Sequence, residues 1–321
     1  MDGNMSEKER FIWANLLILS PNMWHPKDFK NYVDWDPKVW DELTVRSRDV
    51  GFNTIVIDLG DGIVFPSHPE LAIKGSWTPE ETVRQLTRLR KMGLEPIPKL
   101  NFSATHDLWL KQYERMVSSP TYYRVCADVI RDVCEIFGSP RFFHLGLDEE
   151  NAGNQARFDY GVIRQGKLWW HDVRFLANEV ARNGARAWVW ADPAWNMNDY
   201  CAEMPRDVIQ NNWYYWTDIP AIEKAGCRAP AKEDGKIPNA HYRWMRTFLD
   251  LEKAGFDQIP AATTFYHTES MDMVLDFCRR NVSPERLKGF FLMDWRATTP
   301  QPHRRHEILL EEAERLIKKY S

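Results

Sequence analysis

Three consecutive carboxylates end the apolar stretch Phe142-Phe143-His144-Leu145-Gly146-Leu147-Asp148-Glu149-Glu150. An apolar run of this kind predicts a buried strand, whose successive side chains point to opposite faces, so His144, Gly146 and Asp148 are expected to share one face. Adjacent carboxylates repel one another and lose hydration when they are covered. The stretch is therefore either a solvated turn or the end of a strand that carries acid chemistry.

Other short apolar runs alternate with longer segments of helical periodicity, and no long linker separates them. Strand and helix repeated eight times is the pattern of a (β/α)8 barrel, for which 321 residues is a normal length. We therefore predict an α/β fold, a (β/α)8 TIM barrel, with residues 1–321 forming a single domain. The expected strands cover residues 14–19, 54–59, 95–101, 142–147, 185–191, 208–213, 258–264 and 289–294.

Helix boundaries can also be predicted from the sequence. Thr78-Pro79-Glu80-Glu81 combines a capping residue, a proline at the first helical position and an acidic first turn. That helix is expected to end at Met92-Gly93, and Asn183-Gly184 is a similar helix end before a strand. Residues 217–240 carry several prolines and glycines and predict an elaborated loop after the sixth strand. Residues 307–319 predict a closing amphipathic helix.

The composition is that of a soluble globular protein and indicates neither a nucleic-acid partner nor a membrane partner. The formal net charge is -4, with 44% hydrophobic and 27% charged residues. The apolar run at residues 11–19 is too short to span a bilayer, and the five cysteines lack disulfide or metal spacing. We expect a cytoplasmic protein with reduced thiols, or a periplasmic or secreted one if a signal peptide has been removed. No cofactor is expected, and the oligomeric state is open.

Polar residues that follow the expected strands are candidates for one site, because a barrel brings its strand ends to a single cleft. Carboxylates beside indole rings are typical of sugar sites: the rings stack on the apolar faces of a pyranose, and the acids act on its hydroxyls and glycosidic oxygen. The polar candidates are Asn22, His25, Asp58, Asp61, His106, Asp107, Asp148, Glu149, Asp192, Tyr214, Tyr266, His267 and Asp294, and the indoles among them are Trp24, Trp190, Trp195, Trp213, Trp216 and Trp295.

These residues resemble the catalytic barrel of glycoside hydrolase family 20, the β-N-acetylhexosaminidases. The family's strand-four pattern His-x-Gly-x-Asp-Glu is matched by residues 144–149, and this is the most specific match. The second-strand region is similar at residues 52–71, and the third-strand region at residues 97–106. Residues 190–192 resemble the Trp-Asp-Glu of strand five, and Tyr266 stands where the Tyr-Leu-Asp motif of strand seven begins.

The resemblance implies retaining hydrolysis in which the 2-acetamido group of the substrate is the nucleophile. Glu149 would protonate the leaving oxygen and then activate water, and Asp148 would orient the acetamido group. Tyr266 would hydrogen-bond the acetamido carbonyl, and His106, backed by Asp61, would support Glu149. The expected substrate is a glycan with a terminal N-acetylhexosamine or a related 2-acetamido sugar. We expect its contacts to come from Asn22, Trp190, Asp192, Trp213, Tyr214, Trp295 and Asp294.

The chain departs from the family pattern where the family grips the far side of the sugar. Asn22 stands in place of an arginine after strand one. Trp295-Arg296-Ala297 stands where a Trp-x-Glu is expected, and His267-Thr268 follows Tyr266 without the family's aspartate. The identity of the sugar and its linkage are therefore open.

Two other functions remain open. A metal-dependent barrel enzyme is one, since His25, His68, His106 and His267 fall near expected strand ends, although no HxH or HExxH spacing occurs. The other is a carbohydrate-binding barrel without turnover, which the missing hydroxyl-gripping residues permit.

Several candidates also have structural interpretations. His144 is expected to be a hydrogen-bonded core histidine, and Glu150 a solvated acid or one near the start of a helix. Asp192 could cap the next helix or contact the sugar, and Asp294 could pair with Arg296 or another base.

Overall fold

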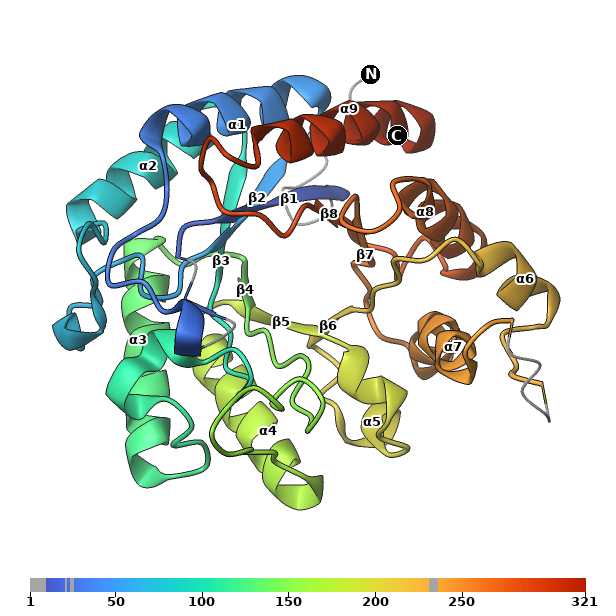
Figure 1. The fold of residues 1–321 in the computed structure, drawn as a ribbon, viewed down its shortest axis with the longest axis horizontal. Coiled ribbons are helices and arrows are strands. Elements are labelled where there is room, and N and C mark those ends of the chain that lie inside the picture. Colours follow the sequence, from blue (N-terminus) through green and yellow to red (C-terminus); the bar gives the residue numbers. More distant parts are fainter. Residues whose placement is uncertain (1–9, 21, 24–25, 231–235) are drawn as a thin grey trace.

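The computed structural model describes residues 10–20, 22–23, 26–230 and 236–321, and the predicted site candidates Trp24 and His25 lie outside these ranges. Eight parallel strands form one sheet that curves into a barrel (Figure 1). They start and end close to the expected runs, so the predicted (β/α)8 barrel is confirmed. The strands are β1 (Ile12–Ile18), β2 (Thr54–Asp58), β3 (Glu95–Lys99), β4 (Phe142–His144), β5 (Arg186–Trp190), β6 (Ile209–Asn211), β7 (Ala261–Thr263) and β8 (Gly289–Met293).

The barrel is nearly closed between β6 and β7. All eight strands lie in one sheet, and neighbours in the order β6-β5-β4-β3-β2-β1-β8-β7 are hydrogen-bonded to each other. Across the remaining gap, Gln210 bridges to Gln258 and Trp213 bridges to Ala261. Backbone hydrogen bonds from Ile259 N to Gln210 O at 3.0 Å and from Ala261 N to Asn212 O at 2.9 Å join the two edges.

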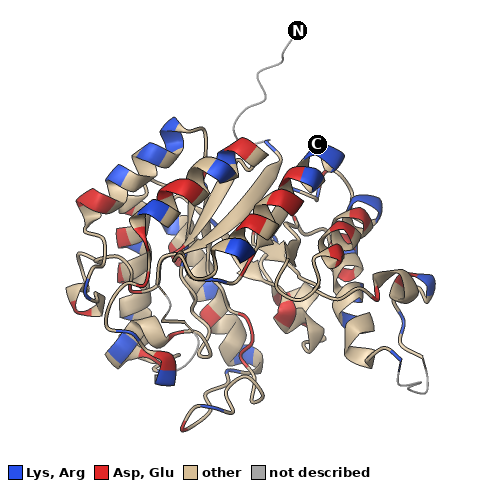
Figure 2. Cartoon of the chain, turned by 45° about the horizontal axis from the view of Figure 1, so that its top comes forward, with Lys and Arg blue, Asp and Glu red and all other residues tan. Residues whose placement is uncertain are grey.

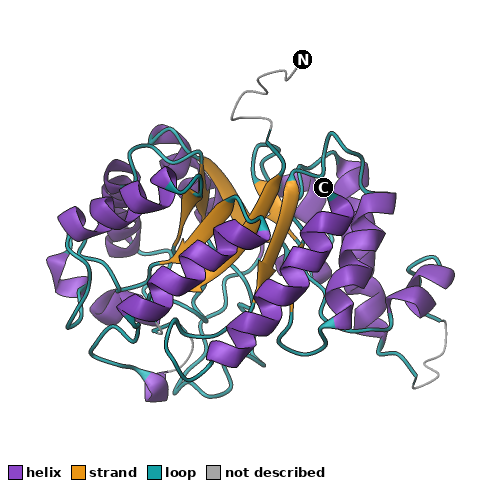
Figure 3. Ribbon diagram, turned by 90° about the horizontal axis from the view of Figure 1, so that it is seen from above, coloured by secondary structure: helices purple, strands orange, loops and turns teal. Residues whose placement is uncertain are grey.

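Helices surround the strands on the outside of the barrel (Figures 1 and 3). A longer helix follows every strand except β5, as expected where crossovers connect parallel strands. The longer helices are α1 (Pro37–Val50), α2 (Pro79–Lys91), α3 (Pro120–Ile136), α4 (Gly166–Arg182), α7 (Asn239–Ala254), α8 (Glu269–Asn281) and α9 (His303–Tyr320), with the short α5 (Tyr200–Glu203) and α6 (Ile219–Lys224) between them.

The predicted helix boundaries are confirmed by the capping contacts. The backbone N–H of Glu81 donates to Oγ1 of Thr78 at 3.2 Å, at the start of α2. Gly93 and Gly184 follow the ends of α2 and α4 with φ of 80° and 79°, the left-handed conformation that glycine adopts without strain. The closing helix is longer than expected and begins at His303.

Apolar side chains fill the inside of the barrel and the layer between strands and helices. Alternate residues of β1, β5 and β8 point inward, among them Leu16, Trp188 and Phe291. One buried ion pair, between Lys99 and Asp58, lies in the strands, with each side chain 1% exposed. Most other charged residues lie on the helices and connecting loops (Figure 2). With its interior filled, the barrel can offer a ligand site only at its ends.

The segment expected to be an elaborated loop connects β6 with α7 and contains α6; residues 231–235 of it lie outside the described ranges. All five cysteines are free. Within the described part of the chain, no helix combines the length and the apolar character needed to cross a membrane.

Candidate active site

A cleft of about 1000 Å³ opens at the carboxyl end of the barrel strands. The described residues that line it follow β3, β4, β5, β6, β7 and β8. Asp148 and Glu149 are among them. Ten aromatic rings of the described residues line the cleft: Trp169, Trp190, Trp195, Trp213, Tyr215, Trp216, Trp244, Phe265, Tyr266 and Trp295.

His106 lies between the two acids. Its Nε2 is 3.4 Å from Oδ2 of Asp148 and 3.3 Å from Oε2 of Glu149. Its Nδ1 is 3.3 Å from the carbonyl oxygen of Met23. The His106 side chain is 7% exposed and that of Glu149 is 38% exposed, so the histidine is covered while the Glu149 carboxylate opens into the cleft.

The position of His106 controls its charge. Burial lowers its pKa, but the carboxylates of Asp148 and Glu149 outweigh burial and raise that pKa to about 9. The ring is therefore protonated near neutral pH, with Nε2 facing the two carboxylates. An imidazolium between two carboxylates reduces the repulsion between them.

The strand that carries the acids ends earlier than expected, at His144. Beyond it the backbone enters the left-handed region at Gly146, Leu147 and Glu149, with φ of 69°, 72° and 57°. The predicted alternation of His144, Gly146 and Asp148 on one strand face is therefore wrong beyond His144. A Cβ at position 146 would lie 2.1 Å from Oδ1 of Asn101, so only glycine fits there.

His144 is a buried core histidine, as predicted. Its Nδ1 accepts a hydrogen bond from the backbone N–H of Gly146 at 3.0 Å. Burial holds its pKa well below the usual range, so the ring is neutral.

Residues from two neighbouring strand ends hold the acids. Nδ2 of Asn101, after β3, donates to Oδ1 of Asp148 at 2.7 Å. The backbone N–H of Glu149 donates to Oδ2 of Asp192, after β5, at 2.9 Å. Both acids thus have fixed backbone or side-chain positions before any ligand binds.

Asp192 is a third carboxyl group in the cleft. Burial, and after it the negative charge of Asp148, raises the pKa of Asp192 well above its ordinary range. Its Oδ1 has no hydrogen-bond partner among the described residues. The raised pKa favours the neutral carboxyl form, which can donate a hydrogen bond through its O–H.

The aromatic wall forms a stepped row of nearly parallel rings. Tyr215 stacks on Trp213 with 4.7 Å between ring centroids and 19° between planes. Tyr266 stacks on Trp216 with 5.8 Å between ring centroids and 16° between ring planes. Tyr215 is 5% exposed and Tyr266 is 57% exposed, so the row runs from the floor of the cleft to its rim. Flat apolar faces of this kind suit the faces of sugar rings.

Comparison with known proteins identifies the fold. No protein-family model matches the sequence, and no curated protein is similar to it. Solved structures of hexosaminidases do match. A chitobiase of Flavobacterium johnsoniae matches with a TM-score of 0.66 at 17% identity, over 96% of this chain and 48% of that one. The chain shares the barrel fold of glycoside hydrolase family 20.

Two other family 20 barrels show how much of each protein is matched. The β-N-acetylhexosaminidase of Bacteroides fragilis matches with a TM-score of 0.60 at 12% identity, over 95% of this chain and 65% of that one. Dispersin B matches with a TM-score of 0.58 at 13% identity, over 95% of this chain and 97% of that one. The chain thus spans about half to two thirds of the first two proteins and nearly all of the third.

Within this barrel, most of the predicted site residues meet in the cleft. They come from six different strand ends, as a barrel site requires. The predicted residues that line the cleft are His106, Asp148, Glu149, Trp190, Asp192, Trp213, Tyr266 and Trp295.

The predicted pairing of Asp61 with His106 is wrong. The carboxylate of Asp61 accepts hydrogen bonds from Oγ of Ser20 and from Nδ2 of Asn22, the latter at 2.8 Å. Asn22 also accepts from the backbone N–H of Lys30 at 2.8 Å, so its amide is engaged with the protein. Neither Asn22 nor Asp61 is among the described lining residues.

Two further predicted sugar contacts point elsewhere. Tyr214 is buried, and its hydroxyl contacts Asp218 and lies 2.8 Å from Nδ1 of His241. Asp294 is buried 3.3 Å from Nε of Arg305 and 3.8 Å from Nε of Arg296, which agrees with its structural interpretation. The predicted sugar contacts of Tyr214 and Asp294 are therefore wrong for the described cleft.

Tyr215 is the site residue that the sequence interpretation missed. It lines the cleft and is buried, with its ring 5% exposed. A period of two from Trp213 would have found it, since residues 213 and 215 share a face when the backbone is extended. Asn101 was missed because the end of β3 was treated as strand rather than as site.

Proposed function

We propose that the protein is a retaining glycoside hydrolase that cleaves 2-acetamido sugars from glycans with the acetamido group as nucleophile. The observation that carries the proposal is the pair Asp148 and Glu149, held beside His106 at the edge of an aromatic cleft. The likeness to family 20 structures supports the fold on which this chemistry is placed.

Glu149 is the proposed general acid. Its carboxylate is the more exposed of the two, at 38% against 15% for Asp148, so it can reach the glycosidic oxygen of a ligand in the cleft. It protonates the leaving oxygen and then, as a carboxylate, activates the water that opens the cyclised intermediate. The charged ring of His106 stabilises the carboxylate form of Glu149.

Asp148 is the proposed partner of the acetamido group. Asn101 and His106 bind its two oxygens, so the carboxylate is fixed in direction. In this position Asp148 accepts a hydrogen bond from the amide N–H of the sugar. It also stabilises the positive charge that develops on the amide as its carbonyl oxygen attacks the anomeric carbon.

Tyr266 and Tyr215 are both candidate donors to the amide carbonyl. Tyr266 fits the family pattern, but its ring is 57% exposed at the rim. Tyr215 is buried on the floor, in the electrostatic field of Asp148, Glu149 and Asp192. The variants Tyr266→Phe and Tyr215→Phe separate them: the true donor loses roughly tenfold or more in kcat on removal of its hydroxyl.

The test is the rate of Glu149→Gln on aryl glycosides with and without the 2-acetamido group. With a phenyl leaving group, the variant should lose about a hundredfold or more in kcat relative to the wild type. Glu285→Gln, a change at an exposed position, is the control and should retain full activity. A wild type that binds these sugars but never hydrolyses them would establish the non-catalytic barrel instead.

A metal-dependent reaction is the second candidate. It is favoured by one observation, that Nε2 of His106 and one oxygen each of Asp148 and Glu149 lie within 4.8 Å of one another. The other predicted histidines do not join them: His68 pairs with Glu70 and Asp128, His267 is not among the described lining residues, and His25 lies outside the described ranges. Activity that is lost in EDTA and restored by a divalent cation would favour this candidate.

A further inference from the structure

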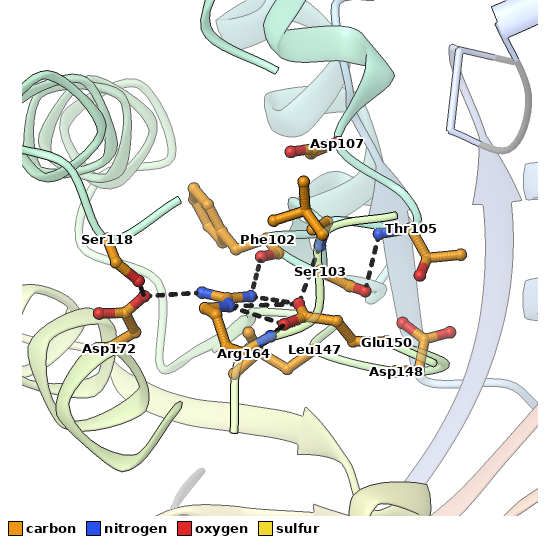
Figure 4. Close-up of polar contacts among 12 residues, drawn as sticks. Phe102, Ser103, Thr105, Asp107, Ser118, Leu147, Asp148, Glu150, Arg164 and Asp172 are labelled. Atoms are coloured by element: carbon orange, nitrogen blue, oxygen red, sulfur yellow. Dashed lines mark hydrogen bonds and ion pairs between the residues drawn. The ribbon is translucent and has the colours of Figure 1, made fainter. Parts of the chain in front are cut away.

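Glu150, the third acid after β4, is not solvated as its sequence context suggests. Its side chain is 4% exposed and pairs with Arg164, which is 2% exposed. The guanidinium donates to both carboxylate oxygens, from Nε to Oε1 at 2.9 Å and from Nη2 to Oε2 at 2.6 Å (Figure 4). Such a two-point pair fixes direction as well as distance.

Arg164 is itself held on its other sides. Nη2 donates to the carbonyl oxygen of Phe102 at 2.8 Å, and Nη1 donates to Oδ2 of Asp172 at 3.1 Å. Asp172, on α4, accepts from Oγ of Ser118 at 2.6 Å (Figure 4). Each buried charged group is therefore paired and hydrogen-bonded, which is the condition for an ion pair to persist inside a protein.

Glu150 also joins the two segments that carry the reacting groups. Its Oε2 accepts from the backbone N–H of Ala104 at 3.0 Å, two residues before His106. Next to it, Oγ1 of Thr105 donates to the carbonyl oxygen of Glu149 at 2.9 Å. The loop after β3 and the loop after β4 are thus cross-linked immediately beside the contact between His106 and Glu149.

The backbone at this point needs support. Leu147 and Glu149 have positive φ, which side chains with a Cβ adopt only where the surrounding structure enforces it. The Glu149 side chain reaches into the cleft and contacts His106. The backbone position from which the Glu149 side chain starts is therefore fixed by the contacts of the two adjacent residues, Asp148 and Glu150.

We propose that Glu150 and Arg164 are positioning residues for Glu149. The pair keeps the Glu149 carboxyl within proton-transfer distance of the glycosidic oxygen, a distance of about 2.6–3.2 Å between heavy atoms. The inference rests on the proposed function, because positioning matters only if Glu149 transfers a proton.

The test uses Glu150→Gln and Arg164→Lys, which retain size but break the two-point pair. The control is Glu95→Gln, which removes a similar pair to Arg141 (2.6 Å) near the opposite end of the barrel. Substrates are the phenyl and the 2,4-dinitrophenyl N-acetyl-β-glucosaminides. The dinitrophenolate leaves without protonation, so it does not need a well-placed acid.

A positioning role predicts a loss in kcat of about tenfold to a hundredfold on the phenyl substrate, little change in KM, and a loss of less than about threefold on the dinitrophenyl substrate. The control variant Glu95→Gln should lose little kcat on either substrate. Equal losses on both substrates would mean that the pair serves only the fold, and would overturn the proposal.

Hydrogen exchange of residues 145–151 gives a readout that does not depend on turnover. Glu150→Gln should speed exchange there, and Glu95→Gln should not. Unchanged exchange in Glu150→Gln contradicts the positioning role, even if the wild type proves active. If the wild type hydrolyses neither substrate, the proposed function fails, and the exchange result alone decides whether the pair orders this segment.

Discussion

His106 makes the stability of the fold depend on pH. Its pKa is raised from 6.5 to about 9, so the ion pairs with Asp148 and Glu149 stabilise the folded state fully below about pH 6.5. That contribution is lost as the pH rises through about 9. The difference in unfolding free energy between wild type and His106→Gln should fall by up to about 3 kcal/mol between pH 6 and pH 9.5. Urea denaturation at several pH values measures it.

The matched control for His106 is His171→Gln, at an exposed position on α4. The difference in unfolding free energy from wild type is measured for both variants over the same pH range. If the His106→Gln difference changes no more with pH than the His171→Gln difference, the His106 ring is not protonated between the acids.

Asp192 should act as a neutral group. Because burial raises its pKa well above the usual range, Asp192→Asn resembles the protonated form and still accepts from the backbone N–H of Glu149. We expect Asp192→Asn to stay within about threefold of wild type in kcat and Asp192→Ala to lose about tenfold to a hundredfold, since only the latter frees Glu149. Equal losses in the two variants would show that an ionised Asp192 is required.

At the residue level, the sequence was informative where a motif coincided with the expected end of a strand. Asp148, Glu149 and His106 were predicted as a group, and the structure brings them together. Asp61 was assigned by motif alone, and its hydrogen bonds go to Ser20 and Asn22 instead. Such a partner choice depends on packing between distant loops, which no local pattern encodes.

At the scale of an element, the end of β4 is the most constrained segment. Gly146 has φ of 69°, and an added Cβ would meet Asn101 at 2.1 Å. Gly93 has φ of 80° but nothing within 4 Å, so a side chain added there would strain the backbone without meeting a neighbour. Gly146→Ala should lower the unfolding free energy by about 2–4 kcal/mol and Gly93→Ala by about 1 kcal/mol, measured by urea denaturation. Equal effects would mean that the close approach of Asn101 relaxes freely.

Element boundaries were predictable where capping chemistry is local. Thr78 begins α2, and glycines follow the ends of α2 and α4, as expected from composition. The alternation through residues 145–150 failed because the backbone becomes left-handed after His144. That path is enforced by hydrogen bonds with residues far away in the sequence: Asn101 and Asp192 accept from the backbone N–H groups of Leu147 and Glu149, and Thr105 donates to the carbonyl oxygen of Glu149.

At the scale of the whole molecule, the number of strands determined the fold class. Eight apolar runs separated by helices allow few arrangements other than a barrel, because parallel strands need helical crossovers. The set of strand ends that line the cleft was not predictable. It depends on the aromatic residues after β5 to β8, and Asn22 and Asp61 after β1 and β2 are not among the described lining residues.

The central claim, that the sugar's own amide attacks the anomeric carbon, is tested most directly by fluorinating that amide. Fluorine withdraws electrons from the attacking carbonyl oxygen and leaves the leaving group unchanged. The kcat of the wild type for 4-nitrophenyl glycosides should fall steadily as the 2-acetamido group carries zero, one, two and three fluorines, by more than about a hundredfold over the series, or about 2.7 kcal/mol of activation free energy. A flat series, or equal cleavage of the 2-hydroxy glucoside, would contradict the account.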